Sequence, residues 1–197
     1  MNKDILICGV GGQGTVLASK IIAAAAVDED NTVHSAETIG MAQRGGPVTS
    51  HVRIGDNAFS PMIPFGSAEL ILAFEPAEAV RNISFLKPGG IAIVNTCPVM
   101  PVTESLKPSG YEGEKMVEYL KSAARCIFVD SDEACRPFGS AKFFNIILLG
   151  IAAGCGRLGL KESTLLNQIE KRVPQKYVDI NKKAFLTGVD IGKKAVV

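Results

Sequence analysis

The chain has 197 residues, 47% of them hydrophobic and 21% charged, and a formal net charge of +1. This length favours one domain, and the composition predicts a folded protein with a sizeable core rather than a disordered chain. The near-neutral charge argues against a nucleic-acid-binding protein. No apolar run approaches the roughly 20 residues that a membrane-spanning helix needs, so no membrane association is expected.

The cysteines and the start of the chain indicate a reducing compartment. The five cysteines are scattered and show no CxxC spacing: Cys8, Cys97, Cys126, Cys135 and Cys155. Scattered cysteines in a chain with a good core are typical of reduced thiols, and this spacing predicts neither a metal site nor an iron–sulfur cluster. The first residues lead directly into a predicted strand, so no signal peptide is expected and the predicted location is cytoplasmic.

Apolar patterning predicts strands and helices that alternate along most of the chain. The expected strands are 4–10, 32–36, 49–54, 69–74, 91–95 and 126–129. The expected helices are 13–27, 76–85, 113–124, 141–153, 161–173 (with Ser163 as N-cap) and 177–194, and turns or loops are expected at 87–90 and 98–110. Such alternation predicts an α/β fold. We expect a three-layer, Rossmann-like, mostly parallel sheet with helices on both faces, in one domain (1–197) with a helical C-terminal segment from about 141 to 197.

A glycine-rich turn joins the first predicted strand to the first predicted helix. It reads Gly9-Val10-Gly11-Gly12-Gln13-Gly14 and fits the spacing of a dinucleotide-binding turn. Gly11 and Gly12 would permit close backbone approach, and the free N–H groups of the following helix would face an anion. The usual acidic residue after the second strand is not clearly present, since Glu37 lies late. The turn therefore predicts either a phosphate site or only a tight strand–helix connection that contacts a protein; the lack of Gly-Lys-Ser/Thr excludes a P-loop.

A second polar and glycine-rich stretch covers residues 37–55 and contains Glu37, Gln43, Arg44, Gly45 and Gly46. A segment of this kind adds little to a core and is typical of functional loops. Two such clusters are expected to meet at the carboxyl ends of adjacent parallel strands, where open α/β sheets bind ligands. Arg44 could hold a phosphate or carboxylate with two hydrogen bonds. The alternative is a loop ordered by its own hydrogen bonds or by a partner chain.

Three further polar residues are weaker candidates for the site. His51 lies in a predicted strand, where a lone histidine is more often structural than functional. Glu75 ends a strand and could face the same cleft, or could simply begin the next helix, whose dipole favours a carboxylate there. Asn95 ends the following strand in the same way. No metal-ligand cluster and no nucleophile–histidine set can be assigned.

Several of these motifs together resemble one family. They are Gly9–Gly14, Glu37-Thr38, Ala42-Gln43-Arg44-Gly45-Gly46-Pro47-Val48, Ser60-Pro61, Leu72-Ala73-Phe74-Glu75-Pro76, Pro88-Gly89-Gly90 and Asn95-Thr96. This combination resembles the gamma-type domain of 2-oxoacid:ferredoxin oxidoreductases. The sequence of residues 40–46 most resembles that of the beta subunits of the indolepyruvate enzymes.

The resemblance implies an accessory subunit of a heteromeric enzyme. Such complexes decarboxylate a 2-oxoacid with thiamine diphosphate and Mg²⁺, form an acyl-CoA, and pass electrons through iron–sulfur clusters to ferredoxin. In the indolepyruvate type a large partner subunit carries the thiamine site and the clusters, so this chain is expected to hold no cofactor alone and to be inactive alone. The glycine loops could face the partner, coenzyme A or the cofactor cleft, and no catalytic residue is assigned. The alternatives are a gamma subunit of a pyruvate or branched-chain 2-oxoacid enzyme and a stand-alone nucleotide-binding Rossmann protein.

Overall fold

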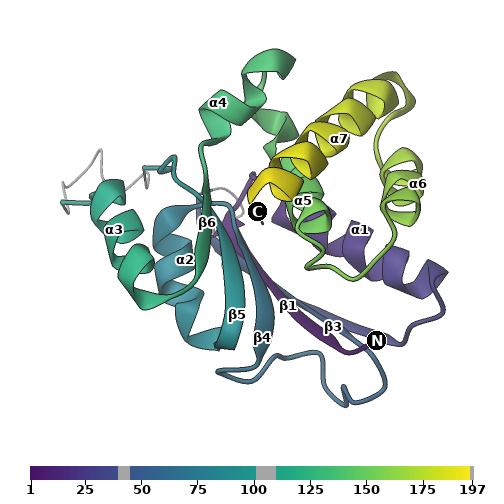
Figure 1. Cartoon of the computed structure of the whole chain (residues 1–197), viewed down its shortest axis with the longest axis horizontal. Helices are drawn as coiled ribbons and strands as arrows, with labels where there is room; N and C mark the ends of the chain where they lie inside the picture. The colour runs from purple at the N-terminus through teal and green to yellow at the C-terminus, as the bar shows by residue number, and fades with distance from the viewer. Residues whose placement is uncertain (40–44, 101–109, 196–197) are drawn as a thin grey trace.

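The structure is a computed structural model that describes residues 1–39, 45–100 and 110–195 (Figure 1). Its centre is a six-stranded sheet in the order β2-β3-β1-β4-β5-β6. The strands are β1 (Lys3–Val10), β2 (Val33–Ile39), β3 (Pro47–Ile54), β4 (Ala68–Ala73), β5 (Leu86–Asn95) and β6 (Cys126–Val129). The pairs β1–β4, β4–β5 and β5–β6 are parallel, which confirms the mostly parallel sheet.

Strand β3 is the exception to the parallel arrangement. It lies between β1 and β2 and is antiparallel to both. The expectation that the two glycine-rich clusters follow adjacent parallel strands was therefore wrong in detail. Strand β2 ends at Ile39 and β3 begins at Pro47, a separation too short for a parallel crossover, which needs a dozen residues or more.

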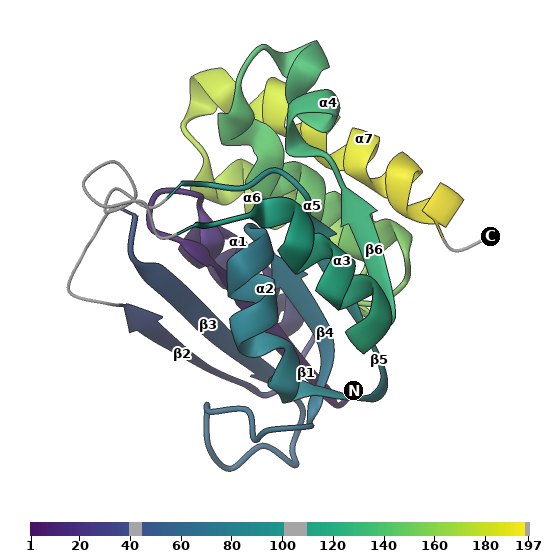
Figure 2. The ribbon, with the colours of Figure 1, turned by 90° about the vertical axis from the view of Figure 1, so that its left-hand side faces the viewer.

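Helices cover both faces of the sheet, as expected for three layers (Figure 2). One face carries α2 (Pro76–Asn82) and α3 (Gly113–Ala123). The other carries α1 (Thr15–Asp28), α5 (Phe144–Gly154), α6 (Glu162–Arg172) and α7 (Val178–Ala195). Alternation along β1 explains the two layers, because Ile5 and Ile7 join the core under α1 and α5, while Leu6 and Cys8 join the core under α2.

Some boundaries differ from the sequence-based expectations. Residues 87–90 form part of β5 rather than a separate turn, and the pairing of β4 with β5 shifts register there. Helix α4 (Ser131–Cys135) was not predicted, because five residues are too few for a periodic pattern. The N-cap of α6 is Lys161, which caps with no side-chain hydrogen bond, so the assignment of Ser163 as N-cap was wrong.

The C-terminal segment is helical, as expected, and packs through glycines. A Cβ added to Gly150 or Gly154 of α5 would collide with the backbone of α7, and one added to Gly188 or Gly192 would collide with the backbone of α5. The two helices therefore touch through main-chain atoms. Residues of α5 and α7 belong to the same core as the face of the sheet that they cover.

In the part of the chain that the structure describes, no single helix has both the length and the apolar character to cross a membrane. Two consecutive helical segments with a bend between them, Ser131–Phe138 and Ala141–Gly154, reach the length and apolar composition of a membrane span only when they are taken together.

His51 has a structural environment inside β3. Its side chain is 2% exposed, its Nδ1 accepts a hydrogen bond from the backbone N–H of Ile63 at 3.2 Å, and its ring lies edge-on to Phe85. Burial lowers the pKa of His51. Protonation would cost the Ile63 hydrogen bond as well as charge a buried ring.

We expect acid to destabilise the fold through His51. With the native pKa below the unfolded value of about 6.5, the unfolded chain binds more protons below that pH, so stability falls as the pH drops through 6.5 toward the native pKa. Each unit of pKa difference corresponds to about 1.4 kcal/mol. Urea unfolding at several pH values between 7.5 and 5.5 should show a shallower fall for His51→Gln than for the wild type; parallel curves would contradict this account.

Candidate functional site

A crevice of about 390 Å³ opens at the carboxyl edge of the sheet, beside the ends of β1, β4 and β5. Chain order reverses between β1 and β4, because α1 leads to the β2 side and the later strands lie on the other side. Open α/β sheets bind ligands at such a switch point. The wall of the crevice includes the predicted turn residues Gly12, Gln13 and Gly14, together with Asn95.

Gln13 fixes the shape of the glycine turn. Its Oε1 accepts from the backbone N–H of Val10 at 2.8 Å, and its Nε2 donates to the carbonyl of Phe74 at 2.9 Å. The side chain thus ties the end of β1 to the end of β4. A Cβ at Gly9 would lie 2.7 Å from that Oε1 and 2.8 Å from the Cβ of Phe74, so only glycine leaves room for this bridge.

Gly14 is the N-cap of α1 and has a left-handed backbone, with φ of 84° and no side-chain cap. A 14-residue helix begins after this residue, and the first N–H groups of a helix have no partner within the helix. A Cβ at Gly14 would collide with the Nδ2 of Asn145, which is 7% exposed and lines the crevice from α5. The helix start and the amide together offer hydrogen-bond donors suited to an anion.

The two predicted glycine clusters do meet. The N–H of Gly11 donates to the carbonyl of Gly46 at 2.8 Å, and the N–H of Gly45 donates to the carbonyl of Gly11 at 3.2 Å. The turn after β1 is thus paired with the start of β3 at the same edge as the crevice. The predicted site residues Gln43 and Arg44 lie outside the described residues.

Asn95 joins three elements at the crevice. Its Nδ2 donates to the carbonyls of Phe74 at 3.0 Å and Cys97 at 3.2 Å. Its Oδ1 accepts from the N–H groups of Cys97 at 3.1 Å and Ser131 at 3.2 Å. The amide is 3% exposed and uses both its donor and acceptor ends on the backbone, so its role is to hold the wall of the crevice in place.

The far wall of the crevice comes from segments that the sequence did not single out. Cys97, Ser131, Asp132 and Lys142 line it. Cys97 donates from Sγ to Oδ1 of Asp130 at 3.4 Å. The backbone N–H of Glu133, which donates to the same oxygen, is the main cause that lowers the pKa of Asp130.

Glu75 lies beside a second, smaller cavity of about 200 Å³ at the same edge. It is the N-cap of α2: its Oε2 accepts from the N–H of Glu78 at 2.9 Å, and its Oε1 accepts from the hydroxyl of Tyr111. Burial, opposed by Arg81 and reinforced by Glu75, raises the pKa of Glu78. Burial, then the charges of Glu78 and Glu75, raises the pKa of the Cys8 thiol.

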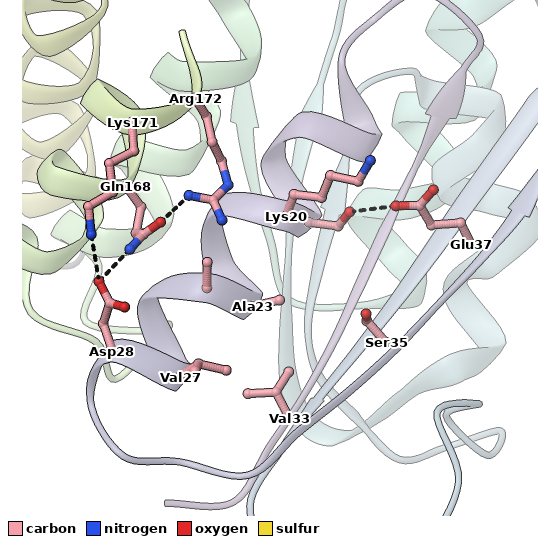
Figure 3. Close-up of a pocket in the computed structure, with 12 residues that line it drawn as sticks. Lys20, Ala23, Val27, Asp28, Val33, Ser35, Glu37, Gln168, Lys171 and Arg172 are labelled. Atoms are coloured by element: carbon pink, nitrogen blue, oxygen red, sulfur yellow. Dashed lines mark hydrogen bonds and ion pairs between the residues drawn. The ribbon is translucent and has the colours of Figure 1, made fainter.

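Glu37 lies in a third and larger cavity of about 650 Å³, between α1, β2 and α6 (Figure 3). Its Oε1 accepts from the hydroxyl of Ser19 at 3.4 Å. Gln168 and Lys171 of α6 both reach Asp28 of α1, and Gln168 also accepts from Arg172. These polar side chains link α1 to α6 and are partners of one another. We therefore place the candidate site at the crevice lined by Gly12, Gln13 and Gly14, where donors converge from several elements.

The structure therefore brings most of the predicted residues together and leaves two apart. Gly9–Gly14, Gly45, Gly46, Glu75 and Asn95 gather at the carboxyl edge, whereas Glu37 and His51 lie elsewhere. Asn145 and Glu78 were missed. Glu78 could have been found as the third helical residue after the N-cap, but no local signal marks Asn145. Across residues 1–39, 45–100 and 110–195, no three His, Cys, Asp or Glu side chains gather as a metal site.

Comparisons with known proteins agree over nearly the whole chain. The family model for pyruvate ferredoxin/flavodoxin oxidoreductase matches residues 4–191. The indolepyruvate oxidoreductase subunit IorB of Archaeoglobus fulgidus is 37% identical, covering 95% of this chain and 94% of the relative. The subunit of the same name from Pyrococcus horikoshii is 36% identical, covering 97% and 96%.

A solved structure extends the likeness to the fold. The 2-oxoglutarate:ferredoxin oxidoreductase of Magnetococcus marinus, determined with 2-oxoglutarate, coenzyme A and succinyl-CoA bound, matches with a TM-score of 0.74 at 18% identity. The match covers 98% of this chain and 31% of that longer chain. The chain belongs to the pyruvate ferredoxin/flavodoxin oxidoreductase family.

Proposed function

We propose that this chain is the accessory subunit of a 2-oxoacid:ferredoxin oxidoreductase of the indolepyruvate type. The complex would convert an aryl-2-oxoacid and coenzyme A to an acyl-CoA and carbon dioxide, with ferredoxin as electron acceptor, in the cytoplasm. The observation that carries the proposal is the 36–37% identity to indolepyruvate oxidoreductase subunits along essentially their full length. We propose that residues 1–197 act as one domain in this role.

The crevice supports a binding role for this chain. Its volume of about 390 Å³ lies within the roughly 300–1,000 Å³ of small-molecule sites. The start of α1, the amide of Asn145 and the ammonium of Lys142 supply donors for a phosphate group, which fits coenzyme A. The residues of this chain would bind and orient the anionic part of that cosubstrate, while its thiol accepts the acyl group elsewhere in the complex.

Thiamine diphosphate, Mg²⁺ and the iron–sulfur clusters belong in this proposal to a large partner subunit. The five cysteines of this chain are free thiols on separate elements, and their spacing suits no cluster. In this assignment the chain contributes the wall of the crevice and backbone N–H groups that bind an anion, and the partner subunit contributes the groups that react.

Reconstitution tests the proposal. Purified anaerobically, this chain alone should be colourless and should not reduce viologen with indolepyruvate and coenzyme A. Activity should appear on addition of the large subunit from the same cells, purified as a brown thiamine-containing protein. Reduction of the dye by this chain alone would contradict the division of labour, and a strong preference for pyruvate over arylpyruvates in the complex would favour a pyruvate-type gamma subunit.

A stand-alone nucleotide-binding protein is the second candidate, and only the glycine crevice favours it. Titration calorimetry of the isolated chain with NAD, FAD and coenzyme A separates the two. Tight binding of NAD or FAD would support the second candidate. Heat from coenzyme A alone, or from none of the three, is the result that the accessory-subunit proposal expects.

A further inference from the structure

The loop that joins β3 to β4 exposes three large apolar side chains, which we call the phenylalanine patch. Phe59 is 94% exposed, Phe65 is 73% exposed, and Met62 between them in the chain is 47% exposed. The loop enters β4 at its first residue, so it lies at the end of the sheet opposite the crevice and projects from it (Figure 2). No charged residue occurs in 57–68. Depletion of charge with enrichment of phenylalanine and methionine is typical of the core of a protein–protein interface.

Hydrogen bonds to the sheet fix the shape of this loop. Nη1 of Arg53 donates to the carbonyls of Ser60 at 3.1 Å and Met62 at 3.3 Å. The N–H of Ile63 donates to the buried Nδ1 of His51 at 3.2 Å, and the side chain of Ile63 is buried. The loop is therefore held with its phenylalanines outward, and a partner that covers them would pay little for ordering the backbone.

The exposed area of the patch is that of an interface centre. At about 150–250 Å² for a fully exposed aromatic side chain, Phe59 and Phe65 together present roughly 250–400 Å². The largest exposed apolar patch of a typical monomer covers about 300–600 Å² and is often functional. One side of a standard interface buries about 800 Å². The patch is thus large enough to form the apolar centre of such an interface, with a polar rim around it.

The shape of the patch indicates what kind of protein covers it. Protruding side chains need a recess in the partner. The cavity beside the loop has only about 120 Å³, and its lining includes the charged residues Lys3, Asp4, Arg53 and Glu69, so it would not accept a phenylalanine. A second copy of this chain would bring one set of phenylalanines against another, because a two-fold contact pairs the same surface on both copies. A different chain with an apolar recess of its own fits better.

We propose that the phenylalanine patch is the docking surface for the large partner subunit, with Phe59 inserted into an apolar recess of that subunit. The inference rests on the accessory-subunit function proposed above and adds the place and the chemistry of the contact. In the Magnetococcus marinus enzyme the matching fold is 31% of one longer chain. A separate chain of the same family must instead reach the rest of its complex through its own surface, and the patch supplies one.

The test compares Phe59→Ala with the matched control Tyr177→Ala, an exposed aromatic residue immediately before α7. Anaerobic biolayer interferometry measures the Kd of each chain for the purified large subunit. We expect the Kd to rise at least tenfold for Phe59→Ala, as for a central interface residue, and to stay within twofold of the wild type for Tyr177→Ala. Added salt should not weaken wild-type binding, because an apolar contact is not screened. The Tm of isolated Phe59→Ala should stay within about 2 °C of the wild type, since so exposed a side chain contributes little to the fold.

Two results would overturn the inference. One is a Kd for Phe59→Ala within twofold of the wild type, which would leave the proposed function standing but remove the patch from the contact. The other is a wild-type chain that sediments alone as a dimer while Phe59→Ala sediments as a monomer, since the patch would then be a contact between two copies. If the wild type and Tyr177→Ala both fail to bind the large subunit, the proposed function fails, and the inference fails with it.

Discussion

Replacing Gly188 by alanine should lower the free energy of unfolding by about 3–5 kcal/mol, at or above the upper end of the usual cost of overpacking. In an ordinary helix the same change is favourable by about 1 kcal/mol, because glycine is a poor helix former. Here the new Cβ would lie well inside van der Waals distance of the carbonyl oxygen of Ile147 and 3.0 Å from the Cα of Gly150. These are backbone atoms, so relief requires α5 and α7 to separate.

Differential scanning calorimetry of the isolated chain measures this effect. At about 2–4 °C per kcal/mol for a chain of this size, the Tm should fall by roughly 6–20 °C. Asp190→Ala, at an exposed position of α7, is the control and should change stability by no more than about 0.5 kcal/mol. A rise in Tm for Gly188→Ala would mean that helix propensity dominates and that the close approach of the helices is not required.

Gly14→Ala should cost about 2–5 kcal/mol of stability, from a left-handed backbone penalty of about 1–2 kcal/mol and overpacking of about 1–3 kcal/mol. Gly14 has φ of 84°, and its added Cβ would meet the amide of Asn145 across the mouth of the crevice. The variant should also lose affinity for coenzyme A in the assembled complex, because Asn145 must move away from the start of α1.

Gly12→Ala separates the two contributions. Gly12 has φ of 103°, but a Cβ there would meet no atom within 4 Å, so this variant incurs backbone strain alone. Urea unfolding should therefore rank the wild type above Gly12→Ala, and Gly12→Ala above Gly14→Ala. Equal costs for the two variants would show that contact with Asn145 contributes little, and would weaken its place in the crevice.

Local patterns in the sequence were sufficient for most of the secondary structure. Continuous apolar runs such as residues 4–10 and 91–95 predict strands covered on both faces, and the structure has β1 and the buried half of β5 there. The turn at Gly9–Gly14 was also predictable, because a strand, a glycine turn and a helix start follow one another in the chain. Each of these features depends on neighbours within a few residues, which the sequence displays directly.

The sequence did not determine which segments meet across the fold. Strand β3 enters the sheet antiparallel between β1 and β2, although its apolar alternation would suit either direction. The helical tail was predicted as helices, but not that Asn145 would reach Gly14 or that glycines would join α5 to α7. Likewise, Glu75 was visible as the end of a strand, while its buried pairing with Glu78 and Tyr111 was not.

The physical reason is the range of the interactions. Helix and strand periodicity arise from backbone geometry between near neighbours, so composition and spacing record them. Close contacts between distant segments and the burial of charge depend on how all the layers pack at once, and no short window contains that information. The sequence by itself thus determined the layers, the glycine turn and the family resemblance, and only the tertiary structure decided which side chains form the crevice and the carboxylate cavity.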